Sequence, residues 1–337
     1  MDDLPASLRS RFPTLPLGMF PTRVERLRGL APRDVELWIK HENESSSLFG
    51  GNKIRKLEFL LGAARARGVR RVLTYGGTGA HHVAATALHG AAHGFEVEAA
   101  LFPQPLDDHV RALLRAEVAA GARLHYVSTA ASALAYRARC GRETAWLAGG
   151  GSSALGTLGW ISGGGEILAQ IDRGALPPVD VVYCALGSCG TVAGLAWSLR
   201  RPRAIELVGV RVAPWPVGRW MTRRLVLGVS RVLARARVEA PEGEPPALRV
   251  EHAFLGPGYG WPSAESLDAV TRARALGLEL DPIYTGKVMA ALLSDARAGR
   301  LRGKRVLFLQ TQSTAPLALK GTVERARTSG ASHDLRA

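Results

Sequence analysis

The sequence predicts an α/β fold with parallel sheets, divided into about two domains. Short, nearly continuous apolar segments alternate with helical patterns rich in alanine and leucine, which is typical of parallel strands covered by helices on both faces. Two of these segments run into glycine-rich turns, as strands often do before a helix. The length of 337 residues is more than one hydrophobic core usually holds.

Six segments are predicted to be buried strands because they are short, mainly apolar and bounded by turn residues or helical patterns. The pattern is weakest in the third segment. In chain order, the segments are residues 71–75, 97–102, 124–127, 179–185, 207–213 and 306–310.

Helices are predicted where apolar residues recur at helical spacing. Residues 219–237 carry several arginines among apolar residues, which favours a helix with a solvated basic face over a basic amphipathic helix at an interface. Residues 240–246, rich in proline and glutamate, predict an exposed loop. The other helical segments are residues 57–67, 83–93, 110–120, 192–200, 264–276 and 287–298.

The composition is that of an ordinary globular protein, with 47% apolar and 22% charged residues. Cys140, Cys184 and Cys189 are odd in number and widely spread, so they predict neither a disulfide framework nor a metal site. The acidic first residues do not resemble a signal peptide, and no apolar run approaches the ~20 residues that cross a bilayer. We therefore expect a cytoplasmic protein without a metal or a membrane partner.

The net charge of +15 raises the hypothesis of a nucleic-acid-binding protein. The arginines, however, are scattered along the chain. We expect no nucleic-acid partner, and a basic, non-catalytic binding protein is the alternative from another functional class.

Lysine is rare in this chain, yet Lys53 and Lys56 lie three residues apart, shortly after a glycine pair, in segment 50–56 (GGNKIRK). Lysine, unlike arginine, can lose its proton when buried and attack a carbonyl group. The segment therefore indicates either a Schiff-base lysine or a loop followed by a helix with a basic first turn. The six lysines are Lys40, Lys53, Lys56, Lys287, Lys304 and Lys320.

Three glycine-bearing turns precede helical patterns, at residues 50–51, 76–80 and 187–191. A glycine turn that opens a helix offers backbone N–H groups to an anion. The turn at 187–191 lacks both the dinucleotide fingerprint and the Gly-Lys-Ser/Thr of a nucleotide-phosphate loop. It predicts either a site for a small phosphate near a lysine or a generic strand-to-helix turn.

Four motifs in a fixed order resemble pyridoxal-phosphate enzymes of the tryptophan-synthase-β fold type. The closer resemblance is to the family of D-cysteine desulfhydrase and 1-aminocyclopropane-1-carboxylate (ACC) deaminase. The motifs are residues 50–58 (GGNKIRKLE), 150–159 (GGSSALGTLG), 256–260 (GPGYG) and 280–287 (LDPIYTGK).

The resemblance implies two open, mostly parallel sheets flanked by helices. It also implies a large cofactor-binding domain formed by residues 1–53 and 166–337, a smaller α/β domain formed by residues 54–165, and a homodimer. The substrate would be a small amino acid.

Pyridoxal 5′-phosphate is the cofactor that the resemblance implies. Lys53 would form the Schiff base and later move protons at the substrate Cα, and Lys56 would help to hold the phosphate. Thr285 and Thr311 match positions beside the pyridine ring. The implied cofactor-binding residues are Asn52, Lys53, Lys56, His81, Gly187, Ser188, Cys189, Gly190, Thr191, Thr285 and Thr311.

The resemblance likewise implies a substrate site in which residues 76–82 grip the carboxylate at a helix N-terminus. Lys53, Tyr259 and Tyr284 would be the catalytic residues, with the tyrosines handling the substrate amine, thiol or protons. Outside these motifs, a packed aromatic ring with a bonded hydroxyl would be the ordinary interpretation of either tyrosine. The implied substrate-binding residues are Thr78, Gly79, Ala80, His81, His82, Tyr259 and Tyr284.

The chain departs from the family pattern at four places near the expected cofactor. Ala80 and His81 stand where the family has serine and an asparagine that bonds the cofactor's 3′-oxygen. Cys189 replaces a glycine of the phosphate turn, and Gln312-Ser313 replace two further glycines. A buried inert thiol is the preferred interpretation of Cys189, and a thiol of lowered pKa at a helix N-terminus is the alternative.

The expected function is α,β-elimination from a small amino acid such as D-cysteine or a β-substituted alanine. A hydroxyl such as that of Thr285 near the pyridine nitrogen would leave the ring a weaker electron sink than a carboxylate would, which suits elimination. ACC deaminases usually carry glutamate at this position, so Thr285 favours elimination over ring opening. The alternatives are β-replacement or elimination on a non-standard substrate in a specialised biosynthetic pathway, and a non-catalytic paralogue that binds the cofactor or an anion.

Overall fold

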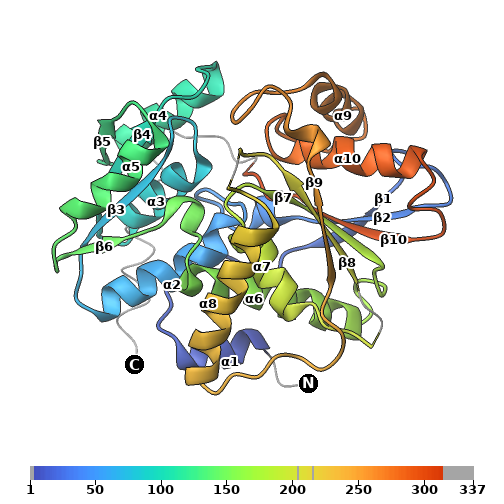
Figure 1. The fold of residues 1–337 in the computed structure, drawn as a ribbon, viewed down its shortest axis with the longest axis horizontal. Helices are drawn as coiled ribbons and strands as arrows, with labels where there is room; N and C mark the ends of the chain where they lie inside the picture. The colour runs from blue at the N-terminus through green and yellow to red at the C-terminus, as the bar shows by residue number, and fades with distance from the viewer. Residues whose placement is uncertain (1–3, 203–204, 215, 314–337) are drawn as a thin grey trace.

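The computed structural model describes residues 4–202, 205–214 and 216–313. Two β-sheets lie side by side, with helices around and between them (Figure 1). The predicted α/β fold with two mostly parallel sheets is confirmed. Residues 314–337, which include Lys320 and the end of the predicted large domain, lie outside the described part of the chain.

Within the described residues, the larger sheet has six strands in the order β1-β2-β10-β7-β8-β9. The edge strand β1 is antiparallel to β2, and the other neighbours pair in parallel. The strands are β1 (Val24–Leu27), β2 (Glu36–Lys40), β7 (Val181–Leu186), β8 (Glu206–Arg211), β9 (Ala247–Glu251) and β10 (Arg305–Leu309).

The smaller sheet is parallel throughout, with the order β5-β4-β3-β6. Its strands all fall inside the segment 54–165 that was predicted as the smaller domain, although the domain boundaries themselves stay a prediction. The strands are β3 (Arg71–Gly77), β4 (Glu96–Phe102), β5 (Arg123–Tyr126) and β6 (Thr144–Trp146).

Helices connect the strands and cover the sheets. The α-helices are α1 (Leu4–Arg11), α2 (Lys53–Ala66), α3 (His81–Ala92), α4 (Asp108–Ala119), α5 (Ala130–Ala135), α6 (Ala154–Asp172), α7 (Gly190–Ser198), α8 (Arg219–Arg235), α9 (Ala264–Arg274) and α10 (Thr285–Arg297). Short 3-10 turns are η1 (Glu42–Glu44), η2 (Tyr136–Arg139), η3 (Gly149–Gly151) and η4 (Ala253–Leu255).

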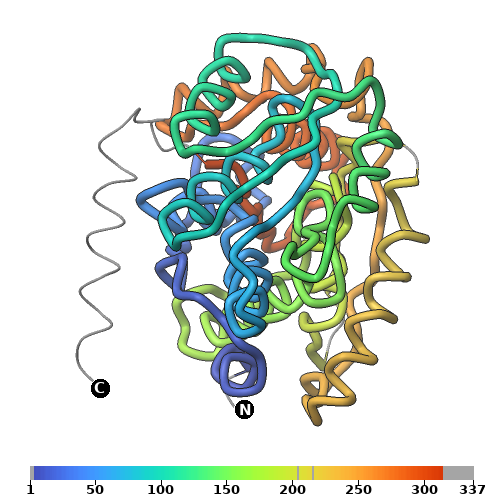
Figure 2. The backbone as a smooth tube through the Cα atoms, turned by 90° about the vertical axis from the view of Figure 1, so that its left-hand side faces the viewer, coloured from blue at the N-terminus to red at the C-terminus, as the bar shows by residue number. Residues whose placement is uncertain are grey.

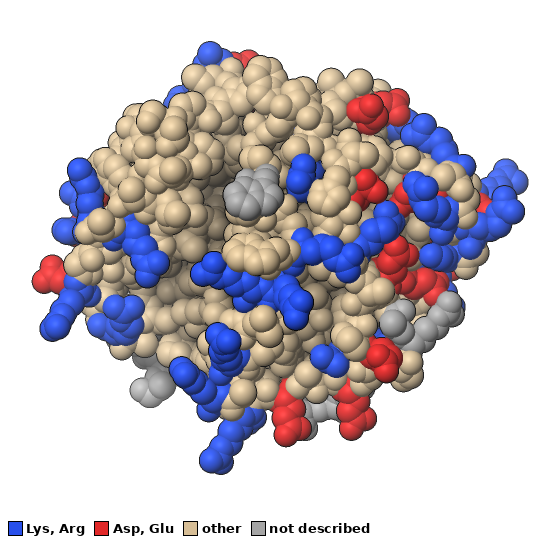
Figure 3. Space-filling view, in the orientation of Figure 1, with Lys and Arg blue, Asp and Glu red and all other residues tan. Residues whose placement is uncertain are grey.

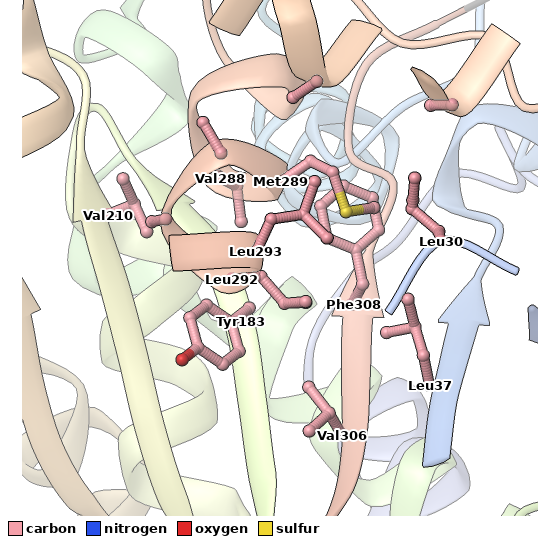
Figure 4. Packing of buried hydrophobic residues seen from close by; sticks show 14 of the residues in the cluster. Leu30, Leu37, Tyr183, Val210, Val288, Met289, Leu292, Leu293, Val306 and Phe308 are labelled. Carbon is pink, nitrogen blue, oxygen red and sulfur yellow. The ribbon is translucent and has the colours of Figure 1, made fainter. Parts of the chain in front are cut away.

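Both faces of the larger sheet are covered, which explains why its central strands are apolar at nearly every position. On one face, Tyr183 and Phe308 pack with Leu292 and its neighbours from α10 (Figure 4). On the other face, Val182 and Leu307 pack in a cluster with residues of α6 and α7. The six predicted strands are confirmed, with ends shifted by one or two residues.

The sequence patterns missed α6 because it is rich in glycine, which disfavours a helix by about 1 kcal/mol per residue relative to alanine. Close packing requires these glycines. A Cβ on Gly159 would lie 2.1 Å from the Arg55 carbonyl oxygen of α2. Tertiary contact therefore decides this helix. The strands β1, β2, β6 and β9 and the helices α1 and α5 were also not predicted.

Helix α8 confirms the predicted helix with a solvated basic face. Arg223, Arg224 and Arg231 are exposed, whereas Val229 and Leu233 are buried. Figure 2 shows α8 on the outside of the molecule.

Candidate active site

A cavity of about 190 Å³ lies where the two sheets meet. It is lined by residues that follow strands β3, β7 and β10, together with the start of α2 and two tyrosines. The carboxyl ends of parallel strands thus surround one space, as expected for a ligand site in an α/β fold. The predicted residues that line it are Asn52, Lys53, Ala80, His81, His82, Gly187, Ser188, Cys189, Thr191, Tyr259, Tyr284 and Thr311.

Lys53 is the first residue of α2 and projects into this cavity. The backbone of the two preceding residues is held in place, because Gly51 N donates to Glu42 O at 2.8 Å and Asn52 N donates to Thr311 O at 2.9 Å. The Lys53 ammonium donates to Asn52 Oδ1 at 2.9 Å. Burial lowers the pKa of Lys53 to about 8, against the opposing charge of Asp281. A lysine of this pKa supplies a neutral amine near neutral pH.

Lys56 lies one turn further along α2 and is buried. Its ammonium donates to Gly150 O and to Ser152 Oγ, both at 3.1 Å. Burial, reinforced by the charge of Lys53, places the pKa of Lys56 well below its ordinary value. Lys56 does not line the cavity, and its amino group lies beside Ser152 and the turn at residues 187–191.

The predicted phosphate turn connects β7 to α7. Cys189 adopts φ 65°, in the left-handed region that favours glycine, so the family's glycine at this position has a conformational reason. Cys189 is buried, and burial raises the pKa of its thiol. The inert interpretation of this thiol is therefore supported.

This turn forms a cradle that fits a phosphate. A Cβ on Gly190 would lie 2.5 Å from Ser152 Oγ and 2.8 Å from the Lys56 ammonium, so only glycine leaves room for an anion there. Ser188 Oγ and Ser152 Oγ are 2.7 Å apart, and Asn52 Nδ2 donates to Thr191 Oγ1 at 3.1 Å. Hydroxyls, the buried amino group of Lys56 and the N-terminus of α7 converge here, and such groups suit a phosphate.

The loop between β3 and α3 carries the residues predicted to bind the substrate carboxylate, and this role stays a prediction. Ala80 is the N-cap of α3 and its side chain makes no capping hydrogen bond, so it does not compete for the backbone N–H groups of the first turn. Thr78 and Gly79 do not line the cavity. The buried Thr78 hydroxyl has no hydrogen-bond partner among the described residues.

Two adjacent histidines begin α3. His82 Nε2 is 2.9 Å from Thr74 Oγ1, whereas His81 Nε2 lies within hydrogen-bond distance of His109 and of the Gln312 amide. Burial places the pKa of both His81 and His82 well below the ordinary value, so both rings are neutral at neutral pH.

Tyr259 and Tyr284 meet across the cavity with their hydroxyl oxygens 2.9 Å apart and their rings nearly perpendicular. Burial raises the pKa of each phenol, so both remain protonated. Lys287 holds the loop that carries Tyr259, because its ammonium donates to Leu255 O at 2.7 Å. One hydroxyl of the pair donates to the other, and the second hydroxyl proton can form a hydrogen bond with a group in the cavity.

Thr285 is fully buried and does not line the cavity. Its hydroxyl donates to Asp281 Oδ2 at 2.5 Å, and Asp281 also accepts from the backbone N–H of Tyr284. Thr311 does line the cavity. The predicted contact of Thr285 with a pyridine ring stays a prediction.

Sequence reasoning missed several residues of this site. Ser152 and Asp281 lie inside two of the quoted motifs, which could have pointed to them. Tyr75 and Met221 line the cavity but belong to no motif, and His109 reaches His81 from α4. Only the folded structure brings these three to the site.

Comparison with known proteins gives the family. The model of the family described as pyridoxal-phosphate dependent enzyme matches residues 15–312. The chain belongs to this family. The match confirms the predicted enzyme class and the predicted cofactor, pyridoxal 5′-phosphate.

Individual relatives of this pyridoxal-phosphate-dependent enzyme cover nearly its whole length. It is 35% identical to nocardicin C-9′ epimerase of Nocardia uniformis subsp. tsuyamanensis, over 90% of this chain and 93% of the relative. It is 33% identical to D-cysteine desulfhydrase of Klebsiella pneumoniae (strain 342), over 90% and 94%. A crystal structure described as an ACC deaminase homologue superimposes with a TM-score of 0.78 at 26% identity, over 97% of this chain and 99% of that one. The predicted resemblance is confirmed.

Among the described residues, no helix has the length and apolar character needed to span a membrane. In the same part of the chain, no cluster of three or more His, Cys, Asp or Glu side chains could hold a metal ion.

Proposed function

We propose that this enzyme catalyses α,β-elimination from a small amino acid such as D-cysteine or a β-substituted alanine. The observation that supports it is the joint presence, in one cavity, of a lysine of lowered pKa and a pair of protonated tyrosines. Elimination needs a base at Cα and an acid at the leaving group, and these residues offer both. The D-cysteine desulfhydrase relative is named for such a reaction.

Pyridoxal 5′-phosphate, when bound, supplies an electron sink for the electron pair left by cleavage of a bond at Cα. Lys56, Ser152 and the turn that ends at Thr191 would hold its phosphate. Lys53 would bond its aldehyde carbon. As a neutral amine, Lys53 would then take the Cα proton of the substrate.

Tyr259 and Tyr284 would supply the proton for the leaving group, because each phenol stays protonated and one hydroxyl supports the other. The N-terminal turn of α3 would orient the substrate carboxylate through backbone N–H groups and the positive end of the helix dipole. Because Ala80 stands where the family has serine, recognition of the carboxylate would depend on the backbone N–H groups.

A second candidate is epimerisation, in which the Cα proton is removed and returned on the other side without loss of a β-substituent. The named activity of the Nocardia relative favours it. The same base and acid would serve, and the outcome depends on the substrate's side chain. β-Replacement or elimination on a non-standard substrate stays the alternative motivated by Ala80, His81, Gln312 and Ser313.

Titration of the holoenzyme with D- and L-amino acids, followed by absorbance and by assays for pyruvate, sulfide and inverted amino acid, separates these candidates. Pyruvate and sulfide from D-cysteine support elimination. Inversion of configuration without pyruvate, for every amino acid tested, would replace elimination by epimerisation. Lys53→Ala should abolish the visible absorbance of the bound cofactor, whereas Lys304→Ala, at an ion pair remote from the cavity, should not.

A further inference from the structure

Two histidines connect the cavity to the molecular surface. His81, at the start of α3, lines the cavity and is 7% exposed, whereas His109, in the first turn of α4, is exposed to solvent. Their Nε2 atoms are 2.7 Å apart and their rings are stacked with centroids 5.0 Å apart. The His81 ring thus borders the cavity, and the His109 ring is in contact with solvent.

The protonation of His81 suits proton transfer. Its ring is neutral because burial, with the charges of His109 and Lys53, places its pKa well below the ordinary value. A neutral imidazole donates at one nitrogen and accepts at the other. Its Nδ1 is buried and has no hydrogen-bond partner among the described residues, so it is available to a group in the cavity.

Gln312 can match either form of His81. Its amide lies within hydrogen-bond distance of His81 Nε2. A half-turn of the amide exchanges its donor NH2 for its acceptor oxygen. Gln312 can therefore donate to His81 Nε2 when that nitrogen is bare and accept from it when it carries a proton. His81 and Gln312 are two of the departures from the family pattern, and the fold places them together.

We propose that His109 and His81 carry protons between solvent and the cavity while the enzyme acts at the substrate Cα. The inference rests on the proposed function. A solvent proton binds His109 Nδ1, the proton on His109 Nε2 passes to His81 Nε2, and the proton on His81 Nδ1 passes to the Lys53 amine or the substrate. Each ring gains one proton and loses one, and the reverse sequence restores both rings.

The test is the rate at which the holoenzyme exchanges the Cα proton of D- and L-alanine for deuterium in D2O at low buffer concentration. His109→Gln retains an amide that can hydrogen-bond to His81 but cannot pass a proton on, so exchange should slow by roughly 10- to 100-fold. His109→Ala should slow similarly and recover as imidazole is added. His125→Gln, which alters a histidine paired with Glu98 away from the cavity, should exchange at the wild-type rate.

A second readout needs no activity. In the cofactor-free protein, 15N spectra of the histidine rings should show a shift of the His81 Nε2 signal on His109→Gln, with the His125 signals unchanged. Wild-type exchange in His109→Gln, or an unmoved His81 signal, would overturn the relay alone. Wild-type enzyme that exchanges no amino acid and forms no product would overturn the proposed function, and the relay with it.

Discussion

At the scale of single residues, burial sets the chemistry of this protein. Lys40, Lys56 and Lys287 are buried and Lys53 lines the cavity, although the chain uses arginine almost everywhere else. Burial lowers the pKa of all four lysines. Arginine could not respond in this way, because its guanidinium keeps its charge at any accessible pH.

The pKa of Lys53, about 8, predicts how the apoenzyme takes up its cofactor. Only the neutral amine attacks an aldehyde, and its fraction rises from about a tenth at pH 7 to about nine-tenths at pH 9. The rate of cofactor attachment, followed by stopped-flow absorbance, should therefore rise with a midpoint near pH 8 and level off above about pH 9. Asp281→Asn removes a charge that raises this pKa, so the midpoint should move to lower pH. A rate independent of pH between 6 and 9 would contradict the assignment.

Glu117 predicts a pH-dependent loss of stability. Its side chain is fully buried, its two oxygens have no partner among the described residues, and burial raises its pKa to about 8. As pH rises from about 4.5 to about 8, the carboxyl group loses its proton more readily in the unfolded chain than in the folded one. The free energy of unfolding is therefore lower at pH 7 than at pH 4 by about 3 kcal/mol. Glu117→Leu should therefore be more stable than wild type at pH 7 and nearly equal at pH 4, by urea denaturation. The exposed Glu239→Leu is the control.

At the scale of elements, glycines let helices and turns approach one another closely. Gly190, in the turn between β7 and α7, lies close to Lys56 and Ser152 of other segments. Gly159 of α6 lies close to the backbone of α2. Local preference alone would not build either contact. The proposed phosphate site is therefore formed by several elements together. Addition of one methyl group at Gly190 tests it.

Gly190→Ala should weaken cofactor binding by at least roughly tenfold, because its Cβ would occupy space beside Ser152 Oγ and the Lys56 ammonium. Gly209→Ala is the matched control, since its Cβ would meet ordinary contacts at 3.5 Å in strand β8. Equilibrium dialysis with pyridoxal 5′-phosphate measures both. Equal affinity in Gly190→Ala and wild type would remove this turn from the phosphate site.

At the scale of the whole molecule, a buried ion network joins the larger sheet to helices α2 and α6. Arg55 contacts Glu42 at 2.7 Å and Glu166 at 2.8 Å, and Lys40 of strand β2 contacts Glu166 at 2.5 Å. The network fixes the helix that begins with Lys53. It thereby couples the stability of the fold to the geometry of the site.

Loss of one partner from this network should destabilise the molecule strongly. Arg55→Met leaves Glu42 and Glu166 without their main cation and should cost about 3–5 kcal/mol of unfolding free energy. Arg123→Met removes an exposed pair with Glu96 and should cost at most about 1 kcal/mol. Denaturant unfolding of both variants provides the comparison, and similar losses in the two would refute a special role of burial.

The net charge of +15 is distributed rather than concentrated. In Figure 3, Lys and Arg side chains are spread over the visible face, and acidic side chains lie among those on the right. We expect no retention of duplex DNA at ~0.1 M salt by gel shift. Salt-sensitive binding that persists at this ionic strength would restore the nucleic-acid hypothesis.

Local patterns were sufficient for the six parallel strands and for the positions of Lys53 and Tyr259. A buried parallel strand needs a short apolar run, and the motif that carries Lys53 is contiguous in sequence, so both leave a local signal. The glycine-rich helix α6 left no such signal, because its propensity is poor and its stability comes from the helices it touches.

The sequence alone determined the family, the cofactor and the parallel α/β architecture, since each is encoded in short ordered segments. Tertiary structure decided the pKa of Lys53, the burial of the Glu117 carboxyl and the contact of His81 with His109 and Gln312. Burial and through-space distance set these properties, and His81 and Gln312 are 231 positions apart in the chain. Only folding brings such distant side chains within hydrogen-bond distance of one another.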